Sequence, residues 1–148
     1  MKISTKVECG IIALIDIAIH SECESVVKIN AISERNNISA KYLEQIFPLL
    51  KQSNIIKSVK GANGGYVLTR EPSDITLSEI VNALDNSILS STTFNDKLVS
   101  DASTAINDCL WQPINDYLCS FSEKLTLKVL ADRYSELNSV RSDIMYYI

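Results

Sequence analysis

Apolar residues at the start of the chain recur at helical spacing. The stripe consists of Val7, Ile11, Leu14, Ile15 and Ala18. It predicts a helix that Ser4 and Thr5 precede and that runs to about His20. Thr5 and Glu8 have the spacing of a capping box, in which a hydroxyl and a carboxylate each accept a free amide of the first turn. The longest apolar run, residues 11–15, is far shorter than the roughly 20 residues that a membrane span needs.

Two shorter helical patterns follow, over residues 28–35 and 39–53. Asn36, Asn37 and Ile38 between them predict a tight turn, and Ser39 is a typical N-cap of the second helix. The buried side of that helix is predicted to hold Tyr42, Leu43, Ile46, Phe47, Leu49 and Leu50. Pro48 predicts a kink rather than a break, because the apolar pattern continues beyond it. Two short helices joined by a three-residue turn indicate a helix-turn-helix.

Residues 55–59 and 66–69 alternate well enough to pair as two strands. Three of the four glycines lie between them, in Lys60-Gly61-Ala62-Asn63-Gly64-Gly65. Such a tip can make a tight turn and lets backbone amides approach phosphate. A plain surface hairpin is the alternative, but a hairpin directly after a helix-turn-helix favours a DNA-binding wing. A nucleotide-binding loop is not expected, because no Gly-Lys-Ser/Thr ending occurs.

The second half of the chain predicts three further helices. The first covers residues 76–85, with Thr76 and Glu79 as a capping box, and residues 86–102 read as a mobile polar loop. A single apolar stripe then follows helical spacing, at Ile106, Leu110, Ile114, Tyr117 and Phe121. Pro113 is expected to bend this helix or to restart it. A last short helix is predicted over residues 127–134, followed by a tail.

The stripe at residues 106–121 has two interpretations. We expect it to be a dimer seam, because an amphipathic helix at the C-terminal side of a small DNA reader suits two-fold DNA sites. Packing onto the core of the same chain is the alternative. The fold class predicted is mainly α with a small β-hairpin. It comprises a winged helix-turn-helix domain over 1–85, the mobile loop over 86–102, and a dimerisation helix with a C-terminal tail over 103–148.

Charge is distributed unevenly along the 148 residues. The net charge is −4, yet residues 1–70 carry +3 and residues 71–148 carry −7. A basic front and an acidic back suit a protein that presents one end to phosphate, although chance could produce the same asymmetry. Residues 1–4 lack the apolar core and cleavage site of a signal peptide, and the four cysteines lie far apart. We therefore expect a cytoplasmic protein with free thiols and no membrane association.

These segments together resemble the Rrf family of bacterial winged-helix transcription regulators. The resemblance rests on Met1-Lys2-Ile3-Ser4-Thr5-Lys6, residues 39–45 with Tyr42-Leu43-Glu44-Gln45, the tip 60–66, Ile75-Thr76, Leu110-Trp111 and Leu125-Thr126-Leu127. It spans nearly the whole chain. The opening residues and the Tyr-Tyr-Ile ending are most similar to the cysteine-metabolism type, which regulates without an iron-sulphur cluster.

The resemblance implies a homodimer that binds double-stranded DNA, with helix 39–53 in the major groove and the wing at the flanking minor groove. It places the DNA contacts at Ser4, Lys6, Ser39, Lys41, Tyr42, Gln45, Ser58, Lys60, Gly61, Asn63 and Gly64. Gln45 can read adenine, Lys41 and Ser39 can reach guanine or phosphate, and Tyr42 would hold phosphate. Glu44 either reads cytosine or braces the helix.

The cysteine pattern departs from that of the cluster-binding members. Those members carry three cysteines in the loop before the long helix, whereas residues 86–108 contain none. We therefore expect no cofactor and no conventional iron-sulphur cluster. An unusual metal site from Glu8, Cys9 and Cys109 is the alternative, and a helix cap and two small buried residues explain these positions equally well. His20, at a helix end, fits a cation or a carbonyl contact better than a metal ligand.

Two classes of function stay open. The first is a sequence-specific repressor whose DNA affinity responds to a small molecule, a redox event or a protein partner. The second is an adaptor that has the same fold but acts through another protein, which the acidic rear half and the polar loop favour. An enzyme is not expected, because the sequence has no nucleophile-base pair, no metal-spaced cluster and a single histidine.

Overall fold

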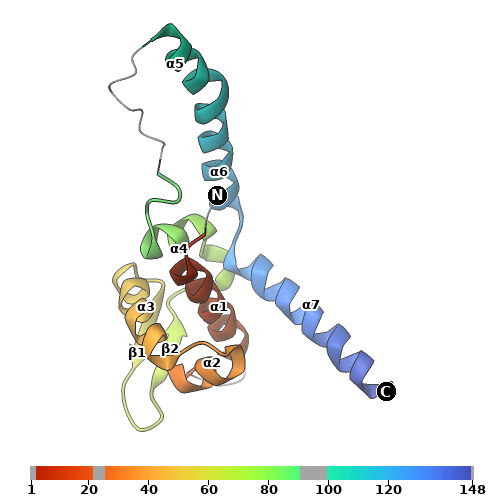
Figure 1. Cartoon of the computed structure of the whole chain (residues 1–148). Coiled ribbons are helices and arrows are strands. Elements are labelled where there is room, and N and C mark those ends of the chain that lie inside the picture. Colours follow the sequence, from red (N-terminus) through yellow and green to blue (C-terminus); the bar gives the residue numbers. More distant parts are fainter. Residues whose placement is uncertain (1–2, 22–25, 91–99, 148) are drawn as a thin grey trace.

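Helix α1 (Thr5–His20) forms the centre of the body in the computed structural model, which describes residues 3–21, 26–90 and 100–147 (Figure 1). Its buried residues Leu14 and Ile17 have no solvent exposure and face the helices and strands that surround them. The predicted helix is confirmed, but its predicted cap is wrong. Ser4 is the N-cap, and its hydroxyl oxygen accepts the Val7 amide at 3.4 Å. Thr5 is therefore the first helical residue, and Glu8 lies exposed beyond the cap.

The helix-turn-helix consists of α2 (Ile29–Asn36) and α3 (Ala40–Gln52). Asn37 between them adopts a left-handed backbone conformation with φ of 52°, which asparagine tolerates better than most residues. Ser39 caps α3 by accepting the Tyr42 amide at 3.4 Å. Both features were predicted, and α3 continues through Pro48 without a break.

Strands β1 (Ile56–Val59) and β2 (Gly65–Leu68) pair antiparallel, with Ile56 opposite Leu68 and Val59 opposite Gly65. The predicted hairpin is confirmed. Val27, just before α2, adds a short third pairing, because it exchanges two backbone hydrogen bonds with Tyr66 at 2.8 and 2.9 Å. The wing is thereby fixed to the segment that leads into the helix-turn-helix.

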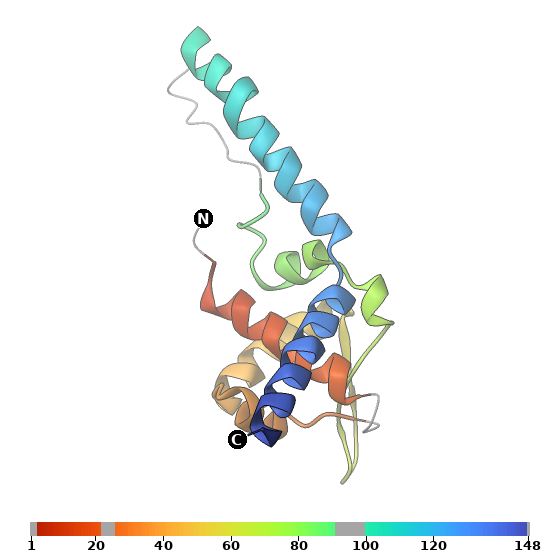
Figure 2. The same ribbon diagram turned by 90° about the vertical axis from the view of Figure 1, so that its right-hand side faces the viewer.

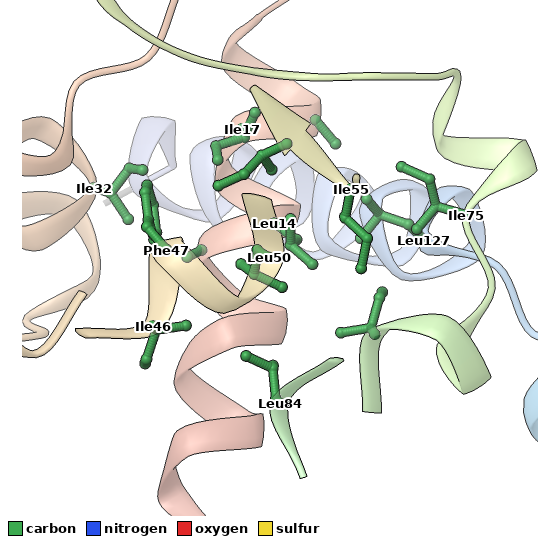
Figure 3. Packing of buried hydrophobic residues seen from close by; sticks show 14 of the residues in the cluster. Leu14, Ile17, Ile32, Ile46, Phe47, Leu50, Ile55, Ile75, Leu84 and Leu127 are labelled. Carbon is green, nitrogen blue, oxygen red and sulfur yellow. The ribbon is translucent and has the colours of Figure 1, made fainter. Parts of the chain in front are cut away.

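The core lies where α1, α3, the hairpin and the start of the C-terminal helix α7 (Leu127–Tyr146) meet (Figure 3). Phe47 of α3 packs edge-on against Tyr66, with ring centroids 4.6 Å apart. Leu127 from the distant C-terminal helix is fully buried in the same cluster. This single cluster holds α3 and the β1–β2 hairpin in fixed relation to each other.

Helix α4 (Leu77–Leu84) follows a 3-10 turn, η1 (Pro72–Asp74), and begins with the predicted capping box. Thr76 accepts the Glu79 amide at 3.2 Å, and Glu79 accepts the Thr76 amide at 3.0 Å. The start of α7 is bonded to the segment before α4, since the Leu127 amide donates to the Ile75 carbonyl at 2.9 Å, and the Leu77 amide of α4 donates to the carbonyl of Leu125, between α6 and α7, at 2.8 Å. The N-terminal end of α7 is therefore part of the body.

A long helix projects from the body in both views (Figures 1 and 2). It comprises α5 (Asp101–Ile106), a π-helical segment η2 (Asn107–Trp111) and α6 (Gln112–Lys124). The backbone stays helical through Trp111 and Gln112, so the helix does not start again at Pro113. Pro113 lies in the first turn of α6, and the Gln112 amide donates to the Asn107 carbonyl five residues back. Most of the loop predicted before this helix, residues 91–99, lies outside the described residues.

Helix α7 (Leu127–Tyr146) has 20 residues, so the predicted end at residue 134 is wrong. Residues 127–147 contain neither glycine nor proline, and nothing local ends the helix. Ion pairs within the helix support it, Lys128 with Asp132 at 3.1 Å and Arg133 with Glu136 at 3.0 Å. No helix in the described parts of the chain has the length and hydropathy of a membrane span.

Candidate nucleic-acid interface

Helix α3 is divided sharply between a buried and an exposed side. Leu43, Ile46, Phe47 and Leu50 lie in the core, whereas the opposite side is open to solvent. The exposed side consists of Lys41, Glu44, Gln45, Pro48, Lys51 and Gln52. It thus presents two cations, a carboxylate and two side-chain amides. These groups can read base edges or contact phosphate.

The side chains predicted at the start of α3 differ in their freedom to reach DNA. Lys41 and Gln45 are four residues apart, so they project from one side of the helix, and both are exposed. Ser39 is exposed but its oxygen already accepts the Tyr42 amide. Tyr42 is half-buried and packs against the core, which leaves less of it for a phosphate contact than the other three offer.

A buried carboxylate ties α1 to the end of α2, directly before the turn into α3. Asp16 accepts from Nε and Nη2 of Arg35 at 3.0 and 2.6 Å, and from Nδ2 of Asn36 at 2.8 Å. Only 4% of its side chain is exposed. Nδ1 of His20 lies 2.9 Å from the backbone oxygen of Asp16, which confirms a carbonyl contact for this histidine. This cluster holds Asn36 and the left-handed Asn37 where α3 must begin.

The wing tip presents most of its predicted contacts outward. Ser58, Lys60, Gly61 and Asn63 are exposed, and Gly64 is half-buried. The Gly64 amide donates to the Gly61 carbonyl at 3.0 Å and closes the turn. Gly61 has a φ of 120°, which side-chain-bearing residues rarely adopt. The tip therefore keeps a geometry that depends on glycine at two positions.

The start of α1 carries the other two predicted contacts, Ser4 and Lys6, which are both half-buried. They lie close to Asp85 at the end of α4. The pKa of the Asp85 carboxyl is below its usual range, first because the Ser87 hydroxyl and amide donate to it at 2.6 and 3.1 Å. The Lys6 charge and the Ser4 hydroxyl lower this pKa further. The positive charge of Lys6 therefore already interacts with the Asp85 carboxylate, and a DNA phosphate would compete for it.

Arg70, directly after the wing, is bonded to the capping box of α4. Its Nη2 donates to Oε1 of Glu79 at 2.9 Å. Burial alone would raise the pKa of Glu79, but hydrogen bonds from the Thr76 amide and from Arg70 outweigh it and lower the pKa. The wing and α4 are thus joined through one carboxylate. The cap made by Glu79 could be predicted from the sequence, whereas its bond to Arg70 could not.

The apolar stripe of the long helix is not covered by its own chain. Ile106, Leu110 and Ile114 are each nearly half exposed, Phe121 is 50% exposed and Tyr117 is 71% exposed. A spacing of four residues drifts round an α-helix by about 40° per step, and the wider turn of η2 reduces this drift. The π-helical segment therefore helps to keep Ile106 and Leu110 in line with Ile114.

The residues considered for a metal do not form a ligand set. Within the described ranges, no three His, Cys, Asp or Glu side chains lie together in a way that could hold a metal ion. Burial, with the Glu8 charge beside it, raises the pKa of the Cys9 thiol and disfavours the thiolate that a metal binds. Cys109 is exposed on η2, and Cys23 lies outside the described residues. In the described part of the chain these donors thus do not come together as a ligand set.

Two elements of the site were missed by sequence reasoning. Asp16 could have been noticed as a lone carboxylate in an apolar stretch, residues 11–19. Lys57 is exposed on β1 beside Ser58, and it adds a cation to the wing that the glycine-rich tip had obscured.

The model of the Rrf2 family, described as "Iron-dependent Transcriptional regulator", matches residues 3–133 of this chain. Curated relatives include the HTH-type transcriptional regulator IscR of Photorhabdus laumondii, which is 30% identical over 138 residues. That alignment covers 93% of this chain and 84% of the relative. The corresponding Escherichia coli protein is also 30% identical, with 93% and 85% covered.

Solved structures give the same result. CymR, the global cysteine regulator of B. subtilis, superimposes with a TM-score of 0.77 at 32% identity, covering 90% of this chain and 98% of that one. IscR of T. potens has a TM-score of 0.73 at 31% identity, with 93% and 90% covered. The superpositions therefore cover most of this chain and most of each neighbour. The chain belongs to the Rrf2 family of DNA-binding transcriptional regulators.

Proposed function

We propose that the protein is a homodimeric repressor that reads a two-fold operator with the exposed side of α3, while the wing and the start of α1 hold the DNA backbone. This proposal rests on the separation of α3 into one buried side and one exposed polar side. Its apolar side is fully used by the core, so the outward set of Lys41, Gln45 and their neighbours is free for another molecule. Polar groups on a rigidly held helix are what base recognition needs.

The roles follow from the positions of the side chains. Gln45 is suited to a bidentate contact with adenine, and Lys41 to guanine or phosphate. Lys60 and Asn63 at the wing tip, with Ser58, Gly61 and Gly64, are suited to the backbone beside the minor groove. Ser4, Lys6, Ser39 and Tyr42 complete the phosphate contacts. In this role the protein binds DNA and catalyses no reaction. It acts in the cytoplasm, where bacterial DNA lies.

We infer that DNA binding does not depend on an iron-sulphur cluster. The absence of a ligand set from Glu8, Cys9 and Cys109 supports this, as does the absence of cysteine from residues 86–108. The likeness to CymR suggests genes of cysteine metabolism as the first targets to examine. Iron and sulphide analysis of protein purified without oxygen tests the inference. Stoichiometric iron with a cluster absorption band would overturn it.

DNA binding itself is tested with operators selected from a random duplex pool. Lys60→Ala should weaken binding to every sequence and reduce the salt slope by about one unit. Gln45→Ala should cost about 1–3 kcal/mol at its own base pair and relax specificity there. Lys128→Ala, on the exposed side of α7, is the matched control and should change neither. Selection of no common sequence, or a two-fold site unaffected by Gln45→Ala, would contradict the proposal.

One observation favours a second role, binding of a regulatory protein partner. The distal half of α7 exposes Leu137, Val140, Ile144, Met145 and Tyr146. Such a patch is large for a surface that stays in water. In a pure adaptor, Lys60→Ala and Gln45→Ala would leave the biological activity intact. Loss of repression with these variants distinguishes the repressor from the adaptor.

A further inference from the structure

Two hollows meet beside the end of α1. The larger, of about 550 Å³, is lined by the last turn of α1, the end of β2 and residues 69–72. The smaller, of about 280 Å³, shares Ala18 and residues 71–72 with it and reaches Lys128 and Asp132 of α7. We call the two together the wing-base groove. The larger hollow alone falls within the range of small-molecule sites, about 300–1,000 Å³.

Arg70, which lines the groove, has donors that its own chain does not use. Its Nη2 donates to Oε1 of Glu79 at 2.9 Å, whereas its Nε is buried without an acceptor among the described residues. The other oxygen of Glu79 accepts the amide and the hydroxyl of Thr76. Arg35 shows the complete arrangement, because its Nε and Nη2 bond both oxygens of Asp16. A buried donor without an acceptor is costly, and a ligand carboxylate that takes both nitrogens would remove that cost.

Charges of both signs line the groove. Glu71 is exposed, and no described residue bonds its carboxylate. Lys128 and Asp132 pair with each other at 3.1 Å, but both are more than half exposed, so this pair is weak. A ligand with negative charge alone would be repelled by Glu71, whereas a zwitterion can satisfy Arg70 and Glu71 together. The Arg70 side chain is 35% exposed, so a molecule in the groove can reach its guanidinium.

We propose that the wing-base groove binds a free α-amino acid as the effector of the repressor, with the carboxylate on Arg70 and the ammonium on Glu71. The ligand carboxylate competes with Glu79 for the guanidinium. Binding therefore releases the link between the wing and α4. The effector role rests on the repressor proposed above, whereas binding of the amino acid needs no DNA.

Titration of the free protein tests the site. Full-length protein labelled with ¹⁵N is titrated with each standard L-amino acid in turn, and the backbone amide shifts are followed by NMR. We expect at least one amino acid to give saturable shifts at Ser21, Thr69 and Ser73, which line the groove. Its primary amide lacks the carboxylate and its N-acetyl derivative lacks the ammonium, so each should bind at least about tenfold more weakly.

Two variants assign the contacts. Arg70→Lys keeps a cation beside Glu79 but cannot offer a bidentate fork, and Glu71→Gln removes an exposed carboxylate. Each should raise the dissociation constant at least about tenfold, whereas Glu34→Gln, exposed on α2, should leave it unchanged. The site is overturned if no standard amino acid gives saturable shifts in the groove, or if both variants bind as the natural protein does. An amide that binds as tightly as its amino acid would overturn the assigned ligand class.

Operator binding separates the effector role from the repressor itself. The saturating amino acid should weaken operator binding at least about fivefold, because Arg70 then no longer holds the wing to Glu79. Equal operator affinity with and without the amino acid would overturn the effector role. Failure to select any operator would overturn the repressor, and the NMR titration would still decide whether the groove binds an amino acid.

Discussion

Asp16 is the residue on which the geometry of the helix-turn-helix most depends. It is a buried carboxylate that holds Arg35 and Asn36 by three side-chain hydrogen bonds. Removing one partner of a buried ion pair leaves a charge without compensation, which costs more than the intact pair contributes. The side chain of Arg35 is 32% exposed, so water offsets part of this cost.

Asp16→Asn should therefore lower the free energy of unfolding by about 2 kcal/mol, less than a fully buried pair would lose. Urea unfolding followed by circular dichroism measures this loss. Asp132→Asn breaks an ion pair whose two side chains are more than half exposed, and it should cost below about 0.5 kcal/mol. Equal losses in the two variants would contradict the assigned role of Asp16.

Glu79 makes stability depend on pH in a predictable direction. Its pKa is lowered in the folded protein, so the ionised form contributes stability above the ordinary glutamate value near 4.5. That contribution is lost as the pH falls through the lowered pKa. At pH 7, Glu79→Gln should cost about 0.5–1 kcal/mol, and below that pKa it should cost almost nothing.

Chemical denaturation of both proteins between pH 7 and pH 2.5 checks this window. Glu123→Gln removes the same charge from an exposed position on α6 and serves as the control. A difference between Glu79→Gln and the natural protein that stays constant over the whole range would show that the carboxylate charge is not responsible.

At the scale of elements, local signals were sufficient wherever a helix or turn is specified by its own residues. Ser39, Asn37 and the pair Thr76 and Glu79 were read correctly, because a cap or a left-handed turn depends on neighbours in sequence. Two adjacent hydroxyls made the start of α1 ambiguous, and the choice of Thr5 over Ser4 was wrong.

Long-range features could not be predicted in this way. The bond from Asp16 to Arg35 joins residues 19 positions apart, and the burial of Leu127 depends on α1, more than a hundred residues earlier. The full length of α7 was missed for another reason. Its distal half has no buried residue, so no core-facing pattern marked it as helix, although no glycine or proline ended it either.

The wing offers a test at this scale. A Cβ atom added at Gly64 would collide with the Val59 carbonyl oxygen, and it would lie 2.9 Å from that of Gly61. Both are backbone atoms, so the turn must open. Gly64→Ala should therefore displace Lys60 and Asn63 and weaken operator binding about tenfold, with little effect on the core.

Binding is measured by fluorescence anisotropy, and the melting temperature by calorimetry. Ala62→Ser, at an exposed position of the same tip, is the control and should bind like the natural protein. Unchanged affinity in Gly64→Ala would mean that the tip does not contact DNA or that the turn relaxes without moving it.

For the whole molecule, the residues that stabilise the fold and the exposed apolar residues that could bind other chains lie in different parts. Of the residues of α7, only Leu127 and Ala131 are buried. Nearly all the large apolar side chains with high exposure lie on the helices after residue 100. The body therefore folds around α1, while the C-terminal helices carry apolar surface that other chains can cover.

Removal of residues 137–148 should accordingly leave the melting temperature within about 2 °C and reduce the binding of an apolar dye. Leu127→Ala, in contrast, should cost about 2–4 kcal/mol, because it leaves a cavity in the core. Calorimetry and dye fluorescence distinguish the two variants. A large drop in melting temperature for the shortened chain would place the distal half of α7 in the body.

The single tryptophan gives this separation a spectroscopic consequence. Trp111, the single tryptophan of the sequence, lies on η2 with 41% of its surface exposed, outside the core cluster. Its emission should shift to shorter wavelength when a second chain covers the projecting helix and removes water from around the indole. Tryptophan fluorescence of this protein is therefore a built-in reporter of assembly, and a dilution series can be read without attaching any dye.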